Sequence, residues 1–342
     1  MFSFFKRAKK EEEVTIIPDP DIELSDPEDN FEEDDELELM LTLTRVIPKN
    51  LKKEHFKLAL SQISELESLV ERIEQNGTLR VPEGVKEFIN SELVTRAKND
   101  KTLLDHYLGC IQDFSDGWKV YSKSKSMNIY LKENYTDGKL DSFLFGGECI
   151  INAPLLNPCC VMAEHELLQN WIPMLKSVDL LHEQSPLKKL IHLKIDLFLP
   201  FKNRDLVTEG TGFLFEEEKA VAFIMKSDYS GSFFGTEFEE ICEKRVRMNL
   251  KDGFMYMEYI DENTCKFKVV LNVDMKLGLG QGWVGKMVLN KVVKVWISKI
   301  VNSSENLKGT EFAKRLIKNP LYRFIAKRLD IEFPDSHDVL NA

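Results

Sequence analysis

Apolar residues in the first third of the chain recur with the period of an α-helix. Asn76-Gly77 ends one such stretch as a left-handed C-terminal cap would, and Val81-Pro82 places a proline at the start of the next. The pattern predicts a helical hairpin over residues 49–99, either packed on the main domain or linked to it. The apolar stripe of its first helix, at spacings of three and four, consists of Phe56, Ala59, Ile63, Leu66, Val70 and Ile73.

The apolar period changes to two after Trp118. From Ile191 to Leu199, alternate residues are apolar on one face and polar on the other, as in a half-buried strand. The order of segments predicts an α+β domain over residues 100–303, in which the last helix closes the concave side of a curved antiparallel sheet. The other strands are expected at 120–121, 127–135, 143–151, 210–215, 220–226, 246–250, 254–260 and 266–275, and helices at 154–181 and 284–300.

The predicted domain is flanked by two tails of opposite charge. The formal net charge is −11, but residues 11–38 hold 15 Asp and Glu and no Lys or Arg, so removing those charges leaves +4 for the rest. An acidic segment with few large apolar groups cannot bury a core, and residues 1–48 are therefore predicted to be a disordered tail. Residues 304–342 are predicted to be a basic amphipathic tail.

The sequence shows no pattern for metal, cofactor or covalent chemistry. Its six cysteines include no Cys-x-x-Cys pair and are interpreted as reduced thiols in a core. His165 lies between two glutamates, but neighbouring residues of a helix point apart, which favours a solvated face. Gly278-x-Gly280-x-Gly282 lacks the spacing of a dinucleotide fingerprint. We therefore predict no catalytic residue, no metal and no cofactor.

The chain also lacks the patterns of secreted and membrane-spanning proteins. Met1–Phe5 places apolar residues before basic ones, which is the reverse of a signal peptide. No apolar run reaches the roughly 18–20 residues that cross a bilayer, and 284–300 is interrupted by lysines. These features predict a cytoplasmic protein, and no motif supports nucleic-acid binding.

Several local motifs follow one another in a family-specific order. The most specific is Leu199-Pro200-Phe201-Lys202-Asn203-Arg204-Asp205-Leu206-Val207, which looks like a Pro…Asn-Arg-Asp-aromatic-Val turn. Through these motifs, residues 100–303 resemble the START (StAR-related lipid transfer) family, especially its phosphatidylcholine-transfer-like members. The resemblance implies a helix-grip fold, a curved sheet wrapped around a long C-terminal helix. The supporting motifs are Gly117-Trp118-Lys119-Val120-Tyr121, Phe145-Gly146-Gly147-Glu148, Asn170-Trp171, Phe254–Tyr259 and Trp283.

The resemblance further implies a lipid, a phospholipid or a sterol, in an internal cavity with two movable segments. One is the loop with Phe233 and Phe234, whose rings either insert at a bilayer surface or pack down on the sheet; the other is Gly278–Trp283 with the helix that follows. Many relatives place a cavity arginine where this chain has Gly210, so that salt bridge is not expected. The expected cavity and gate residues are Phe233, Phe234, Trp283, Val284, Val288, Ile195 and Leu197, and the expected structural residues are Trp171, Arg204 and Asp205.

The C-terminal segment is strongly basic. Residues 308–328 carry seven Lys and Arg against the single acid Glu311, with apolar residues interleaved at helical spacing. Such a segment either lies on an anionic membrane or docks its apolar side on the domain. The membrane contacts expected for the first alternative are Lys314, Arg315, Arg323 and Lys327.

Together these features predict a non-enzymatic carrier or sensor that encloses one lipid and contacts membranes peripherally. The first alternative is an interaction protein of the same fold, which uses the helical hairpin or the acidic tail to bind a protein partner in a larger assembly. The second is an enzyme on a related scaffold. That enzyme would need His, Asp and Glu clustered on the inward faces of the strands, where the pattern is mainly aliphatic.

Overall fold

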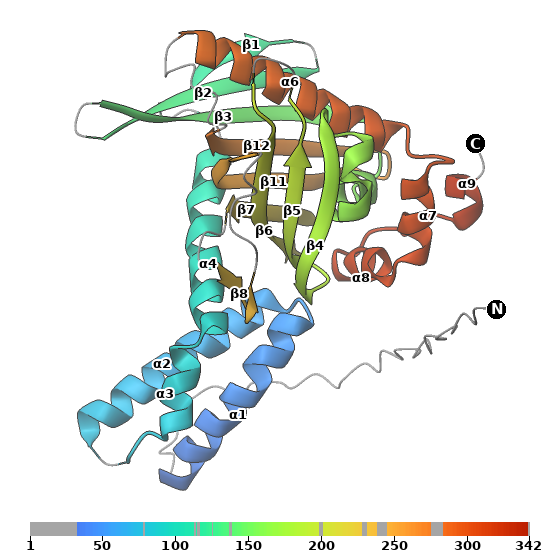
Figure 1. Cartoon of the computed structure of the whole chain (residues 1–342). Coiled ribbons are helices and arrows are strands. Elements are labelled where there is room, and N and C mark those ends of the chain that lie inside the picture. Colours follow the sequence, from blue (N-terminus) through green and yellow to red (C-terminus); the bar gives the residue numbers. More distant parts are fainter. Residues whose placement is uncertain are drawn as a thin grey trace, which may run out of the picture.

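The computed structural model of the chain describes residues 33–77, 79–112, 114, 117–124, 126–136, 139–197, 201–227, 231–237, 245–274 and 283–340. Its helices surround one large sheet, and three of them project from it as an extension (Figure 1). The helices are α1 (Glu33–Lys52), α2 (Phe56–Asn76), α3 (Glu83–Ile89), α4 (Glu92–Ile111), α5 (Leu156–Ala163), the 3-10 helix η1 (His165–Asn170), α6 (Trp283–Glu305), α7 (Glu311–Lys318), α8 (Pro320–Arg328) and α9 (Ser336–Leu340).

The large sheet is antiparallel apart from the short strand β10, which pairs with β6 in parallel. Along the sheet the strands follow the order β1-β2-β3-β12-β11-β7-β6-β5-β4, and β8 and β9 form a separate small hairpin. The strands are β1 (Lys119–Lys123), β2 (Met127–Thr136), β3 (Lys139–Ile151), β4 (Leu175–Ser185), β5 (Lys188–Ile195), β6 (Arg204–Phe215), β7 (Ala220–Ser227), β8 (Ser232–Phe233), β9 (Thr236–Glu237), β10 (Val246–Arg247), β11 (Asn249–Asp261) and β12 (Thr264–Asp274).

Helices cover both faces of this sheet. Because successive side chains of a strand point to opposite faces, Leu206 of β6 lies in the core of the concave face and Phe213 in that of the convex face. On the convex face Phe213 shares a core with Leu104 and Tyr107 of α4. The concave face receives α6, which crosses the strands in Figure 1. The predicted helix-grip fold is thus confirmed.

A glycine lets α6 approach the concave face closely. A Cβ atom on Gly147 of β3 would lie 2.6 Å from Ile297 Cδ1, which is closer than packed atoms allow. Ile297, Val293 and Ile300 occupy one side of α6 and are buried against the sheet core. A larger residue at position 147 would therefore require the Ile297 side chain or the helix to move.

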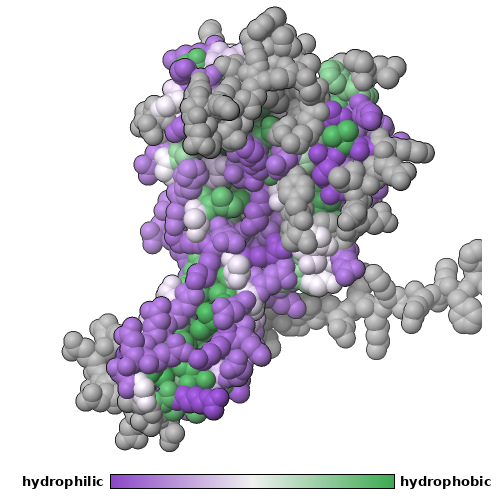
Figure 2. Space-filling model, turned by 60° about the vertical axis from the view of Figure 1, so that its left-hand side comes forward, coloured by the Kyte–Doolittle hydropathy of each residue, from purple (hydrophilic) through white to green (hydrophobic). Residues whose placement is uncertain are grey.

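The N-terminal helices form an extension with a core of its own. Met40, Leu43 and Ile47 of α1 recur at spacings of three and four and are buried in this core with residues of α2. The prediction of a disordered tail up to residue 48 is therefore wrong over 33–48, because the acidic residues there occupy the outer side of an amphipathic helix. Figure 2 shows a band of hydrophobic residues along this extension, flanked by hydrophilic ones.

The loop between α1 and α2 joins this extension to the sheet. Glu54 accepts a hydrogen bond from the backbone N–H of Leu187, between β4 and β5, at 2.8 Å. Burial raises the pKa of Glu54 to about 7, although this hydrogen bond and the charges of Lys188 and Lys189 act in the opposite direction. The neighbouring His55 ring lies 3.3 Å from Arg328 of α8. The extension is thus attached to both the sheet and the C-terminal helices.

The C-terminal helices dock on the domain through their apolar side. Leu316 and Ile325, in α7 and α8, are fully buried in the main core. The Tyr322 hydroxyl donates to the buried Glu164 carboxylate at 2.7 Å, and the Asn319 amide donates to the same oxygen at 2.9 Å. Of the two alternatives for this segment, the structure shows that its apolar side docks on the domain. In the ranges that the structure describes, no helix is both long and apolar enough to span a bilayer.

Glu54 makes the attachment of the extension sensitive to pH. A carboxyl group whose pKa is raised in the folded state contributes stability that is present below about pH 4.5 and is lost as the pH rises through about 7. Glu54→Gln, which mimics the neutral carboxyl, should therefore be more stable than the wild type at pH 8 by about 2 kcal/mol, with a smaller difference at pH 5. Urea unfolding at the two pH values measures both differences, and the exposed Glu65→Gln on α2 is the control. Equal pH dependence of Glu54→Gln and the wild type would contradict this role.

Candidate functional site

The concave face beneath β5, β6 and β7 is apolar and incompletely covered. Ile191 and Ile195 of β5 point to this face together with the buried Leu193, as the alternation in the sequence predicts. Met225 of β7 faces the same side and is half-buried. Side chains of this kind make a surface on which an apolar molecule would lose contact with water.

Gly210 of β6 lies at one end of this surface, where it pairs with Lys189 and Met225. Among the described residues, a Cβ atom added to Gly210 would meet no atom within 4 Å. Two residues further along the same face, a Cβ on Gly212 would lie 3.1 Å from Leu187 and Phe223. The concave face is thus filled at Gly212 and open at Gly210.

The C-terminal half of α6 fills the other part of the concave face. Trp171 anchors this packing, because its Nε1 donates to the backbone oxygen of Val161 at 3.2 Å and its ring centroid lies 5.7 Å from that of Trp296 of α6. These contacts place Trp171 in the packing beneath α6, and its structural role stays a prediction. The side chains of the predicted residues Trp283, Val284 and Val288, in the first half of α6, lie outside the described part of the structure.

Leu197 lies outside the lining strand. Strand β5 ends at Ile195, and the Leu197 N–H donates to the Asn203 side chain at 3.1 Å in the turn before β6. The predicted strand was too long because the apolar alternation continues through this turn. Of the two predicted lining residues on β5, Ile195 lies on the concave face and Leu197 follows the end of the strand.

Phe233 and Phe234 pack on the convex face and not beside the open concave surface. We define residues 231–237, the β8–β9 hairpin, as the clasp; it lies next to α4 (Figure 1). Phe233 is fully buried with Leu190 and Val207, which point to the convex side. Of the two alternatives for these rings, the structure shows packing on the sheet, on the face opposite to the expected cavity.

The clasp is held by polar contacts as well as by its aromatic rings. Arg96 Cζ of α4 lies 4.5 Å from the ring centroid of Phe233, and Arg96 Nη2 donates to the Ser232 backbone oxygen at 3.3 Å. The Glu92 carboxylate accepts from the Phe234 N–H at 3.1 Å. The sequence gives no local signal for these partners, because Arg96 and Glu92 lie more than a hundred residues before the clasp.

Arg204 and Asp205, for which a structural role is predicted, begin β6 and make polar contacts with neighbouring segments. The Asp205 carboxylate is fully buried and accepts hydrogen bonds from His192 at 3.0 Å and from Arg247 at 2.9 Å. Burial alone would raise the pKa of Asp205, but these two donors hold it below its ordinary value. Arg204 Nη1 donates to the backbone oxygen of Lys202 at 2.5 Å.

The predicted membrane-contact residues lie on α7 and α8. Lys314 is ion-paired with Glu311 at 3.0 Å, and Arg315 with Glu166. Arg323 Cζ lies 4.5 Å from the ring centroid of Phe333, and Lys327 is exposed. These four cations thus lie on the outer surface of the docked helices, and the first two are partly neutralised by neighbouring acids.

The described thiols and acids form no metal centre. Among the described residues, no group of three or more His, Cys, Asp or Glu side chains is placed to hold a metal ion. Burial raises the pKa of Cys149, Cys160 and Cys265 to about 12, so these thiols are protonated at neutral pH. A protonated thiol is a weak nucleophile and a poor metal ligand.

Comparison with solved structures shows that the chain has the START-domain fold. Human StAR-related lipid transfer protein 5 superimposes with a TM-score of 0.54 and 12% sequence identity, over 62% of this chain and 97% of that protein. Human STARD10 gives a TM-score of 0.49 and 13% identity over 71% and 88%. No protein-family profile and no curated protein sequence matches the chain. The likeness to phosphatidylcholine-transfer proteins in particular stays a prediction.

A substitution at Asp205 separates a structural role from ligand contact. Asp205→Asn leaves the half-buried Arg247 without its counter-charge and should lower the free energy of unfolding by about 2–4 kcal/mol at pH 7. Because the pKa of Asp205 is lowered in the folded state, the difference should shrink as the pH falls through that pKa. Urea unfolding measures it. The control Asp179→Asn removes an exposed pair with Lys194 and should change stability by less than about 1 kcal/mol. Unchanged stability of Asp205→Asn would contradict the structural role.

Proposed function

We propose that this chain binds one lipid, a phospholipid or a sterol, between the concave face of its sheet and α6, and carries or senses it at membranes without a chemical step. The partly buried apolar residues Ile191, Ile195 and Met225 on the concave face, with open space at Gly210, support this proposal. Each methylene group removed from water stabilises the bound state by about 0.8 kcal/mol, so a shielded acyl chain or sterol ring stays bound during transit. The fold shared with human StAR-related lipid transfer protein 5 agrees with it.

Contact with a membrane surface would use the outer side of the C-terminal helices. Arg323 and Lys327 of α8 are exposed there, with Lys318 at the end of α7. Exposed cations attract anionic lipid headgroups by about 1 kcal/mol each near the surface. Because the apolar sides of these helices are buried, we infer an electrostatic contact and not an insertion.

The α1–α3 extension supports a second candidate function. It has its own core and shows a hydrophobic band on its surface (Figure 2), which a binding partner could cover. Under this alternative the domain is a scaffold in a larger assembly and carries no lipid. The state of the purified protein distinguishes the two, because only the carrier retains a stoichiometric lipid.

Native mass spectrometry of the purified full chain tests the carrier proposal. We expect one bound lipid per chain in the wild type, and at least about tenfold less in Gly210→Leu, whose side chain would occupy the open space. Leucine should fit without loss of stability, since glycine within a strand is unfavourable by about 0.5–1 kcal/mol. The matched control is Gly109→Leu, at an exposed position on α4 with open space around it.

Two outcomes would contradict these expectations, and they differ. A folded wild type without any co-purifying lipid would contradict the carrier proposal and favour the scaffold. Full lipid occupancy of Gly210→Leu would leave the carrier intact but show that the ligand lies elsewhere on the concave face.

A further inference from the structure

A group of buried charges lies between α4 and the convex face of the sheet. Asp100 of α4 is 0% exposed and Glu209 of β6 is 1% exposed. Asp100 contacts the ammonium groups of Lys188 at 2.5 Å and Lys226 at 2.9 Å, and Glu209 contacts Lys188 at 2.8 Å and Arg96 at 2.8 Å. Burial alone would raise the pKa of Asp100, but the two lysines hold it below its ordinary value, so the carboxylate stays charged.

Apolar side chains at this position would stabilise the packing of α4 on the sheet as well as the buried ion pairs do. Stability alone therefore does not explain why the buried ion pairs are present. Buried, fixed charges beside a cleft are instead characteristic of sites that bind a ligand. Such a cleft is present: an open pocket of about 700 Å³ adjoins the charges. It lies between the exposed side of α4, the end of β7 and the clasp, and is lined by Glu92, Thr95, Arg96, Asn99, Thr102, Leu103, Lys226, Ser227 and Ser232.

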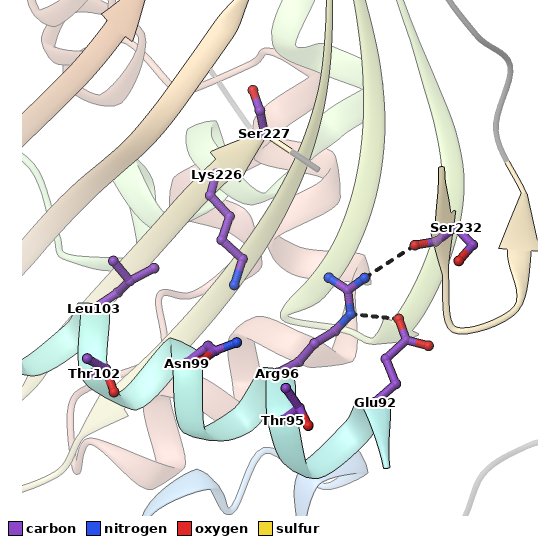
Figure 3. Close-up of a pocket in the computed structure, with 9 residues that line it drawn as sticks. All are labelled: Glu92, Thr95, Arg96, Asn99, Thr102, Leu103, Lys226, Ser227 and Ser232. Atoms are coloured by element: carbon purple, nitrogen blue, oxygen red, sulfur yellow. Dashed lines mark hydrogen bonds and ion pairs between the residues drawn. The ribbon is translucent and has the colours of Figure 1, made fainter. Parts of the chain in front are cut away.

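The nitrogen donors of three lining residues converge in this pocket. Figure 3 shows the side chains of Asn99, Lys226 and Arg96 directed toward one another. The Lys226 ammonium donates to Asp100 at 2.9 Å and lies 3.6 Å from the Glu209 carboxylate, which uses part of its donor capacity. Among the described residues the exposed Asn99 amide makes no hydrogen bond. The Asn99 amide thus faces the pocket with unused donors beside the Lys226 ammonium.

The acceptors of the site are engaged elsewhere. Glu92, the carboxylate in the lining, accepts from Arg96 Nε at 2.7 Å and from the Phe234 N–H at 3.1 Å. Asp100 and Glu209 lie behind the cations and do not line the pocket. Ser227 accepts the Leu250 N–H, which leaves its own hydroxyl proton for another acceptor. The lining therefore suits a ligand that is rich in acceptor oxygens.

We propose that this pocket binds a phosphate ester group, with the Asn99 amide and the Lys226 ammonium donating to its oxygens beside the Arg96 guanidinium. A phosphate ester carries about −1.5 to −2 charges at neutral pH and three strong acceptor oxygens, which match a set of convergent cationic and amide donors. The site lies on the face opposite to the apolar concave surface. It is therefore a second, polar site that is independent of lipid enclosure.

Asn99→Asp tests the site without disturbing the buried charges. Asn99 is exposed, so the variant should fold normally, whereas a substitution of Lys226 would leave Asp100 buried without one of its partners. The new carboxylate would face the bound phosphate and should weaken its binding at least about tenfold. The matched control is Asn170→Asp, at an exposed position at the end of η1 and outside the pocket.

The measurement uses the full chain and separates two sources of the phosphate group. Isothermal titration calorimetry with glycerol 3-phosphate detects a soluble ester. Co-sedimentation with phosphatidylcholine vesicles, with and without phosphatidic acid, detects a lipid headgroup. Saturable binding of either probe by the wild type and by Asn170→Asp, with loss in Asn99→Asp, supports the site.

Two results would overturn the proposal. One is a folded wild type that binds neither probe, and the other is equal binding by Asn99→Asp and the wild type. Native mass spectrometry of Asn99→Asp is the independent readout: its lipid occupancy should equal that of the wild type, because the concave face is unchanged. A failure of the phosphate site is therefore distinguishable from a failure of lipid enclosure.

Discussion

The structure depends on one constraint: a sheet whose two faces are both apolar must be covered on both sides. Helix α6 covers the concave face and α4 the convex face, and neighbouring residues of a strand therefore lie in different cores. The described half of α6 packs closely on Gly147 of β3, whereas a Cβ atom on Gly210 would meet no described atom within 4 Å. The candidate lipid surface is thus the part of the concave face that α6 does not fill, while the polar pocket lies where α4 meets the convex face with charged side chains.

Much of the fold could be predicted because its signals are local, but the helix expected over 154–181 is wrong from 175 onward, where residues 175–185 form β4. The period of two in residues 191–195 and the apolar stripe of α2 can each be recognised within the segment itself. Each pattern shows which side of the element is buried, without knowledge of its packing partner. The order of the motifs then led to the helix-grip fold. The α1 helix could not be found in this way, because its apolar residues are spread among acidic ones and its burial depends on packing against α2.

The candidate site was predicted less completely, because its residues are brought together by contacts over long separations. The alternation in β5 correctly placed Ile195 on the concave face. The same type of signal could not decide which side of the sheet the Phe233 loop would cover, because its partner Arg96 comes from α4. The buried Asp100 and Glu209 look like ordinary surface charges in the sequence, and only the docking of α4 on the sheet removes them from water.

The contact between His55 and Arg328 links residues that are 273 positions apart. Because the ribosome releases a chain from its N-terminus onward, helices α1 and α2 emerge long before the helix that they finally touch. The core formed with Leu316 and Ile325 is likewise incomplete until nearly the whole chain has been synthesised. We therefore expect that native packing is reached only after α7 and α8 have been synthesised, and that apolar surface on the nascent sheet needs protection by chaperones until then.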